Sequence, residues 1–131
     1  MSKYPTIAFF DTTADDRKYF YAHFKKSGHI YFSHIPVQDD ESADLKAVEI
    51  LSVHVASSID KDVMRQMPHL KLIATRATGF DNIDLKEAKR HNITVCNVPG
   101  YGANAVAEYS FMLMLALSRK LIPSTQQMST G

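Results

Sequence analysis

The stretch that decides the fold runs from Leu70 to Asp84 and reads L-K-L-I-A-T-R-A-T-G-F-D-N-I-D. Its apolar first part predicts a buried strand, Leu70–Thr75, and the strand leads into small residues, a glycine and an Asp-Asn pair. Such a junction exposes backbone N–H groups, and the carboxyl end of a parallel strand is where an α/β protein holds a small anion. We therefore expect the segment Thr75–Asp84 to bind a carboxylate or a phosphate.

Short apolar strands alternate with helical stretches on both sides of this segment, which is the pattern of βαβ units. Because the crossovers in such units are right-handed, the sequence predicts an α/β fold with a flavodoxin-like, doubly wound parallel five-stranded sheet in the order 2-1-3-4-5. The functional edge of this sheet consists of the loops that follow the strands. The expected strands are Thr6–Phe10, His29–His34, Ala47–Val53, Leu70–Thr75 and Ile93–Val98.

The sequence predicts some of the helices between and after these strands more clearly than others. Asp11, Thr12 or Thr13 can cap the first helix, and Asp84 caps a helix that ends at Arg90. A weak helix follows the polar stretch Gln38–Asp44. The other two are a short helix around Ile59–Met67 and a long helix from Ala103 or Asn104 to Lys120. The polar segment Leu121–Gly131 is expected to carry no element of its own.

The long helix is apolar on nearly all sides, because Val106–Leu117 contains almost no polar residue. Such a helix has to be covered all round, and a small five-stranded domain covers only one side. We therefore expect helix 103–120 to pack against another domain or another copy of the chain, so that the protein is a homo-oligomer.

Composition excludes several classes of function. The formal net charge of +1 gives no electrostatic basis for binding nucleic acid or an anionic membrane surface, and the apolar run Phe111–Leu117 is too short to span a bilayer. The histidines show no convincing metal-ligand spacing, so no metal site is expected. Cys96, the only cysteine, is predicted to be inert inside an apolar strand. The absence of a disulfide pair and of an apolar N-terminal signal core indicates a cytoplasmic protein.

Four separated stretches then resemble one known family. After T-R-A-T-G-F-D-N-I-D at 75–84 come N-V-P-G-Y at 97–101 and A-V-A-E-Y at 105–109, followed by L-S-R-K at 117–120. Residue types, order and spacing are similar to those of the D-isomer-specific 2-hydroxyacid dehydrogenases, most of all to the D-lactate dehydrogenase branch. The resemblance implies a substrate-binding domain over residues 1–102, an interdomain or dimerisation helix over 103–120, and a tail over 121–131 where the NAD-binding domain would begin.

The resemblance also implies roles for five residues. Thr78 and Gly79 donate backbone N–H groups to the substrate carboxylate, the Tyr101 phenol bonds to the bound acid, and Val106 lies beside the nicotinamide. His54 stands where the family often carries an aromatic residue near the substrate side chain. Each residue has a plainer alternative: Gly79 permits a positive φ in a turn, Tyr101 and Val106 only pack, and His54 is an ordinary surface histidine.

The family's catalytic arginine, glutamate and histidine have no counterparts here, so no catalytic residue is expected in these residues. No G-x-G-x-x-G dinucleotide motif occurs either. The sequence thus indicates an N-terminal fragment of an NAD-dependent D-2-hydroxyacid dehydrogenase that acts on a small 2-hydroxy or 2-oxo acid, D-lactate or pyruvate being favoured, and that is inactive alone. The alternative is a non-catalytic flavodoxin-like binding or signalling module, such as a receiver domain built around Asp11. The sequence lacks the aspartate that a receiver domain requires at the end of the third strand and the lysine that it requires after the fifth.

Overall fold

The computed structural model describes residues 4–41 and 44–130. The chain divides into two compact units, Met1–Pro99 and Gly100–Gly131. Each unit has its own secondary structure.

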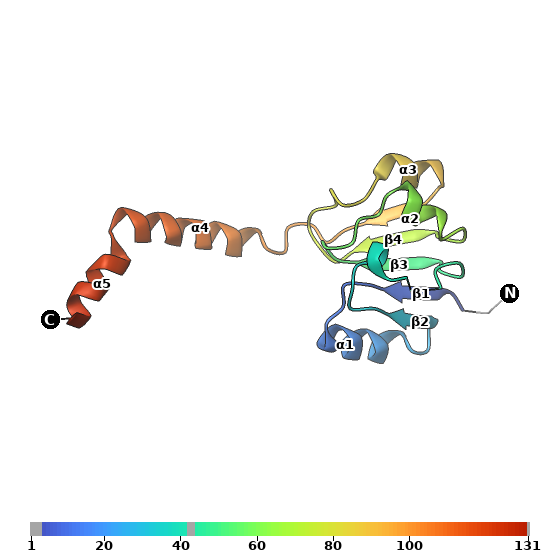
Figure 1. The fold of residues 1–131 in the computed structure, drawn as a ribbon, viewed down its shortest axis with the longest axis horizontal. Helices are drawn as coiled ribbons and strands as arrows, with labels where there is room; N and C mark the ends of the chain where they lie inside the picture. The colour runs from blue at the N-terminus through green and yellow to red at the C-terminus, as the bar shows by residue number, and fades with distance from the viewer. Residues whose placement is uncertain (1–3, 42–43, 131) are drawn as a thin grey trace. The chain divides into compact units, whose positions relative to one another are not determined.

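The first unit is built on a parallel five-stranded sheet (Figure 1). The strand order is β2-β1-β3-β4-β5, which confirms the predicted topology. In the ladder, Ile7 pairs with Ile50 and Leu51 pairs with Ile73, so the apolar centres of the strands lie side by side. The strands are β1 (Thr6–Phe9), β2 (His29–Phe32), β3 (Ile50–Val53), β4 (Leu72–Thr75) and β5 (Thr94–Cys96).

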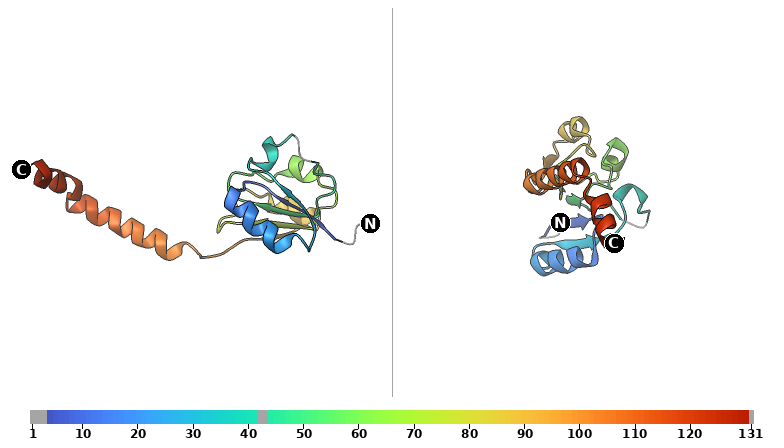
Figure 2. Two further views of the ribbon diagram at one scale, coloured as in Figure 1. Left: turned by 90° about the horizontal axis from the view of Figure 1, so that it is seen from below. Right: turned by 90° about the vertical axis from the view of Figure 1, so that its left-hand side faces the viewer.

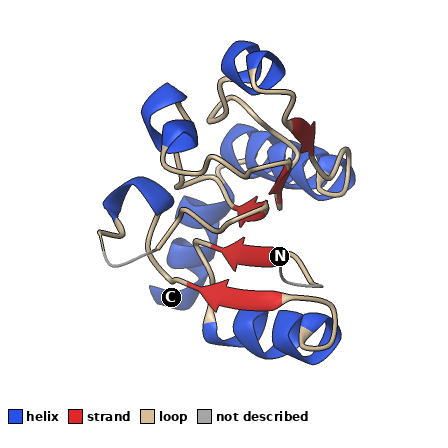
Figure 3. Cartoon of the chain, turned by 90° about the vertical axis from the view of Figure 1, so that its right-hand side faces the viewer, coloured by secondary structure: helices blue, strands red, loops and turns tan. Residues whose placement is uncertain are grey.

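Helices of the first unit pack around the central strands (Figure 3). They are α1 (Ala14–Phe24), α2 (Lys61–Arg65) and α3 (Leu85–Arg90), with a 3-10 turn, η1, at Val37–Asp39. Asp60 and Asp84 cap α2 and α3 with their carboxylates, while Thr13 and Asp16 form a reciprocal capping box at the start of α1. The predicted cap at Asp84 is confirmed, and Thr13 is the cap among the three candidates for α1.

Successive residues of a strand point to opposite faces of the sheet, and each face carries an apolar layer. Phe10, Leu51 and Ile73 are fully buried in the main core, together with Met67 next to α2 and Ala88 from α3. On the opposite face, the Phe9 ring stacks on Phe20 of α1, with ring centroids 4.7 Å apart. Apolar side chains therefore cover both faces of the sheet at β1, and the loops at the carboxyl edge are attached to this buried core.

Two sequence-based predictions about this unit are wrong. In the described residues, which leave out positions 42 and 43, no α-helix follows the polar stretch Gln38–Asp44 before β3. Asp40 instead accepts hydrogen bonds from Tyr31 and Ser33, and Asp44 accepts one from the backbone N–H of Lys46; such side-chain bonds compete with a helix. Cys96 is also exposed rather than buried, because β5 is an edge strand.

The second unit consists of two consecutive helices, α4 (Ala103–Ser118) and α5 (Leu121–Thr130), which differ in direction (Figure 2). The expected long helix is confirmed. The expectation that Leu121–Gly131 has no element is wrong, because residues 121–130 form α5. Lys120 has a φ of +50°, which ends α4, and Pro123 lies in the first turn of α5, where its missing N–H costs no helical hydrogen bond. None of the described helices has the length and apolar character needed to cross a membrane.

Candidate functional site

The loops at the carboxyl ends of β1, β3, β4 and β5 meet at one edge of the sheet. Four side chains cross between these loops: Asp11 after β1, Arg76 after β4, Asn82 further along the same loop, and Asn97 after β5. The loop after β4 carries Thr78 and Gly79.

The peptide groups on either side of Thr78 are held by their carbonyl oxygens. The backbone N–H of Val98 donates to the Ala77 carbonyl at 3.0 Å, and the Asn97 side-chain amide donates to the Thr78 carbonyl at 2.7 Å. The Thr78 hydroxyl adds a bond to the Val98 carbonyl at 3.1 Å. The loop after β5 therefore fixes both peptide planes.

This arrangement determines where the N–H groups point. In a planar trans peptide, the carbonyl of one residue and the N–H of the next point in opposite directions, and the structure contains no cis peptide among the residues described. With both carbonyls directed at the β5 loop, the N–H groups of Thr78 and Gly79 face the other way. Within residues 4–41 and 44–130, neither N–H donates to a protein acceptor, and both residues are exposed.

Gly79 is not required by its backbone conformation. Among the glycines described, only Gly100 has a positive φ, +73°. A Cβ added to Gly79 would meet nothing closer than a carboxylate oxygen of Asp81, at 3.6 Å. The plainer interpretation of Gly79, a residue chosen for a left-handed turn, is therefore wrong.

His54 lies at the start of a turn that two side chains clamp from opposite sides. Its N–H and that of Ser57 donate to Oδ2 of Asp11, at 2.8 and 3.2 Å. The carbonyls of the same two residues accept from the Asn82 amide, at 3.1 and 2.7 Å. The backbone of His54 is thus fixed, and its half-buried side chain starts from a defined position at the sheet edge.

Arg76 is a structural residue of the first unit. Its guanidinium donates to the carbonyls of Phe10 and Asp11, at 2.7 and 3.0 Å, and to the Ser52 hydroxyl at 3.0 Å. Burial lowers the pKa of Arg76, and the nearby carboxylates of Asp16 and Asp11 act in the opposite direction. With its donors used on the ends of β1 and β3, Arg76 is committed to the scaffold rather than to a ligand.

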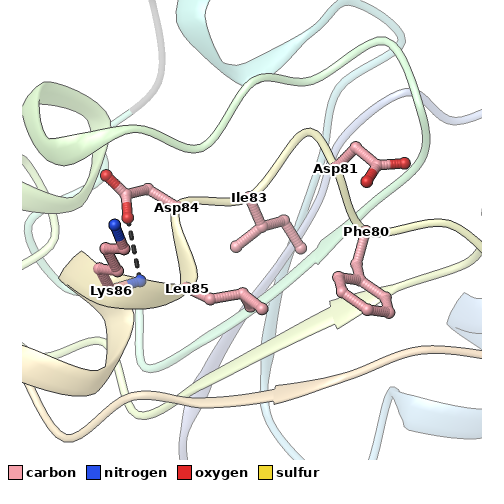
Figure 4. Close-up of a pocket in the computed structure, with 6 residues that line it drawn as sticks. All are labelled: Phe80, Asp81, Ile83, Asp84, Leu85 and Lys86. Carbon is pink, nitrogen blue, oxygen red and sulfur yellow. Dashed lines mark hydrogen bonds between the residues drawn. The ribbon is translucent and has the colours of Figure 1, made fainter.

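An open hollow of about 440 Å³ lies next to Thr78 and Gly79, in the later part of the loop after β4 (Figure 4). Phe80, Ile83 and Leu85 give it an apolar lining, and the Asp84 carboxylate beside it accepts from the N–H of Lys86 at 3.0 Å. The lining includes the carboxylates of Asp81 and Asp84 but neither Thr78 nor Gly79. The hollow, which Lys86 also lines, therefore does not include the two N–H groups.

The two remaining predicted site residues belong to the second unit. Tyr101 lies just before α4 with an exposed ring, and Val106 lies in the first turn of α4, also exposed. Around them, α4 exposes large apolar side chains on all sides, among them Tyr109, Phe111 and Leu115. No group of three or more potential metal ligands occurs in the part of the chain that the structure describes.

The sequence predicts a donor role for the loop after β4, and neither the Asn97 bond nor the bonds that Asp11 makes follow from that prediction. The position of Asp11 predicts a helix cap or the aspartate of a receiver domain, whereas in the structure its φ is +53° and its carboxylate accepts from the N–H groups of His54 and Ser57. A signal for Asn97 was available. If a peptide N–H points at an anion, the carbonyl of the same peptide points the other way and needs a hydrogen-bond donor of its own. An asparagine at the end of the neighbouring strand is a suitable donor.

Comparison with known proteins supports the observations above. Residues 7–128 match the family described as D-isomer specific 2-hydroxyacid dehydrogenase, catalytic domain. The chain is 36% identical over 87 residues to a glyoxylate reductase of Thermococcus litoralis, covering 66% of this chain and 26% of that protein. It is also 36% identical over 93 residues to a D-lactate dehydrogenase of Curvularia clavata, covering 70% of this chain and 27% of that protein.

A solved structure agrees with the fold. The D-lactate dehydrogenase of Aquifex aeolicus, crystallised with NAD and lactic acid, superposes with a TM-score of 0.82 at 31% identity. The match covers 88% of this chain and 34% of that structure. The chain therefore spans about a quarter to a third of the length of the proteins that it resembles.

Proposed function

The chain belongs to the D-isomer-specific 2-hydroxyacid dehydrogenase family, and we propose that it supplies the substrate-carboxylate site of an NAD-dependent D-2-hydroxyacid dehydrogenase. The observation that carries this proposal is the pair of N–H groups at Thr78 and Gly79. Both residues are exposed. Both N–H groups point away from carbonyls that are held by the loop after β5, and neither N–H has an acceptor among the described residues. Two converging amides hold a carboxylate through charge-assisted hydrogen bonds.

The chain's own residues bind and orient the acid in this proposal. Thr78 and Gly79 hold the carboxylate, which leaves C2 of the substrate directed away from the loop, and the Tyr101 phenol provides a further hydrogen bond to the acid. The half-buried His54 lines the position of the substrate side chain. NAD, when bound, exchanges the hydride with C2.

The proposed substrate is a small 2-hydroxy or 2-oxo acid. D-Lactate with pyruvate is the first candidate, supported by the similarity to D-lactate dehydrogenases. Glyoxylate is the second candidate, supported by the similarity to a glyoxylate reductase. The two N–H groups recognise the carboxylate common to both, so selection between them falls to the surroundings of His54.

The residues present fit only one part of NAD. Val106 offers an exposed apolar side chain suited to the face of a nicotinamide ring, while its N–H is used by the Gly102 carbonyl at 3.0 Å. The described helices offer no glycine-rich turn for a pyrophosphate. We therefore assign residues 1–102 to substrate binding, 103–120 to an interdomain or dimerisation helix, and 121–131 to the approach to a separate NAD-binding domain.

The remaining parts of the proposal concern assembly and activity. Helix 103–120 joins copies of the chain into a homo-oligomer, because it exposes large apolar side chains, among them Tyr109, Phe111 and Leu115. The partners do not include nucleic acid or a membrane surface, and the protein is cytoplasmic. The chain alone is inactive, since it has no counterpart of the family's catalytic histidine, glutamate and arginine.

Calorimetry on the 131-residue chain tests the site. Pyruvate and glyoxylate should bind weakly, in roughly the millimolar range, because only part of the pocket is present. Pyruvamide, which has the same shape without the negative charge, should not bind measurably. Equal binding of pyruvate and pyruvamide would refute a carboxylate site, and tight binding of pyruvate would show that the site lies elsewhere.

A further inference from the structure

We propose that Asn97 is the positioning residue that aims the N–H of Gly79 at the substrate carboxylate. The inference rests on the proposed function of the loop and adds a residue from another strand to it. Asn97 does not touch the substrate in this account; it acts through the peptide between Thr78 and Gly79.

The first step in the argument is the geometry of that peptide. The Asn97 side-chain amide donates to the Thr78 carbonyl at 2.7 Å, which is short for an N–H···O bond. The Thr78 carbonyl and the Gly79 N–H belong to one rigid peptide plane. Holding the oxygen on the β5 side therefore holds the Gly79 N–H on the opposite side, where the acid would bind.

The second step is the absence of a competing restraint. Gly79 has no side chain, its φ is not in the left-handed region, and an added Cβ would have only an ordinary contact. The neighbouring peptide has its own tether, because Val98 donates its backbone N–H to the Ala77 carbonyl at 3.0 Å. The Thr78 N–H is thus fixed by the backbone of the β5 loop, whereas the Gly79 N–H depends on one side chain.

The third step is electronic. A hydrogen bond to a carbonyl oxygen polarises the whole peptide and makes its N–H a stronger donor. The bond from Asn97 therefore improves the Gly79 N–H both in direction and in strength. An anion bound at Gly79 strengthens the Asn97 bond in return.

The test compares two changes of amide to carboxylate, Asn97→Asp and Gln38→Glu. In N97D, a carboxylate that can only accept hydrogen bonds faces the Thr78 carbonyl. The Thr78–Gly79 peptide therefore rotates, and the Gly79 N–H no longer points toward the bound carboxylate. Gln38 makes the same kind of contact elsewhere, donating to the Ala56 carbonyl at 3.2 Å and accepting from the Ser58 N–H at 2.9 Å, with no bond to Thr78. Asn97→Ala, which removes the donor without adding charge, is the second variant in case N97D folds poorly.

Titration with pyruvate is followed by the amide signals of Thr78 and Gly79 in the folded 131-residue chain. We expect Kd to rise about tenfold in N97D, less in N97A, and not at all in Q38E. The carbonyl ¹³C signal of Thr78 should shift in both Asn97 variants before any ligand is added. A residue that merely stabilised the fold would lower Tm without changing Kd or that signal.

The outcomes separate the two proposals. If pyruvate moves neither amide signal in the unaltered chain, the proposed carboxylate site is refuted, and the role of Asn97 is refuted with it. If pyruvate binds the unaltered chain but N97D and N97A bind it equally well, only the role of Asn97 is overturned.

Discussion

Replacing Gly79 by alanine separates the candidate site from the scaffold that carries it. The φ of Gly79 is outside the left-handed region, and the new Cβ would lie 3.6 Å from Oδ2 of Asp81 with no closer atom. Alanine also reduces the conformational freedom of the unfolded chain. We therefore expect the free energy of unfolding to stay unchanged or to rise by up to about 1 kcal/mol.

Gly28→Ala is the matched control, because the same methyl group meets a different environment there. A Cβ at Gly28 would lie 2.5 Å from the Pro5 carbonyl oxygen, which is backbone and cannot move aside cheaply. Two side-chain carbons of Ile7 are also close, Cδ1 at 3.1 Å and Cγ1 at 3.2 Å. We expect G28A to lose about 1–3 kcal/mol of stability, the usual cost of overpacking.

Urea denaturation followed by circular dichroism measures both stabilities, and pyruvate titration measures the site. In G79A the methyl group stands beside the proposed donor and narrows the approach of the carboxylate, so Kd should rise about tenfold, the equivalent of ~1.4 kcal/mol. Two results would refute the reasoning. A G79A variant as unstable as G28A would show that Gly79 serves the fold, and unchanged pyruvate affinity would show that it does not serve the site.

Three further predictions concern the scaffold and the second unit. Arg76→Ala leaves two backbone carbonyls and the Ser52 hydroxyl without their donor, so it should lower the free energy of unfolding by about 2–4 kcal/mol in chemical denaturation. The control Arg65→Ala removes only an exposed ion pair and should lower it by at most ~0.5 kcal/mol. Equal losses of stability in the two variants would contradict the structural role of Arg76. The hydrogen bond from Arg90 lowers the pKa of Glu87 below its ordinary value of 4.5, so Glu87 stabilises the fold above about pH 4.5 and this contribution is lost as the pH falls through the lower folded-state pKa. The Glu87→Gln variant should accordingly lose less stability on acidification than the unaltered chain, and parallel curves of stability against pH would contradict this. Introducing Phe111→Glu with Leu115→Glu on α4 should convert a dimer or higher oligomer into a monomer in sedimentation velocity, and the prediction fails if the unaltered chain already sediments as a monomer at high concentration.

The sheet could be predicted from the sequence because its signals are local and agree with one another. Apolar runs of strand length, the capping carboxylate of Asp84 and the fixed hand of βαβ crossovers leave one strand order. The two segments predicted wrongly are those where polar side chains decide the outcome. Asp40 and Asp44 bond to nearby groups and prevent a helix before β3, whereas Thr125 and Ser129 bond within α5 and leave it helical.

The candidate site was predictable in place but not in detail. The segment Thr75–Asp84 stands out because a glycine-containing loop follows a buried strand, and the resemblance to the family points to Thr78 and Gly79 within it. The direction of their N–H groups depends on Asn97 and Val98, which are about twenty residues away along the chain. Contacts across that distance come from the register of β4 and β5, so the sequence offers Asn97 as a suitable donor without determining which carbonyl it meets.

A crystal structure of the 131-residue chain soaked in pyruvate tests the central claim most directly. The account predicts the pyruvate carboxylate within hydrogen-bonding distance, roughly 2.7–3.2 Å, of the backbone nitrogens of both Thr78 and Gly79. The Thr78 carbonyl should remain bonded to the side chain of Asn97. A carboxylate bound at any other place in the chain, or a Thr78–Gly79 peptide whose N–H faces the β5 loop, would contradict it.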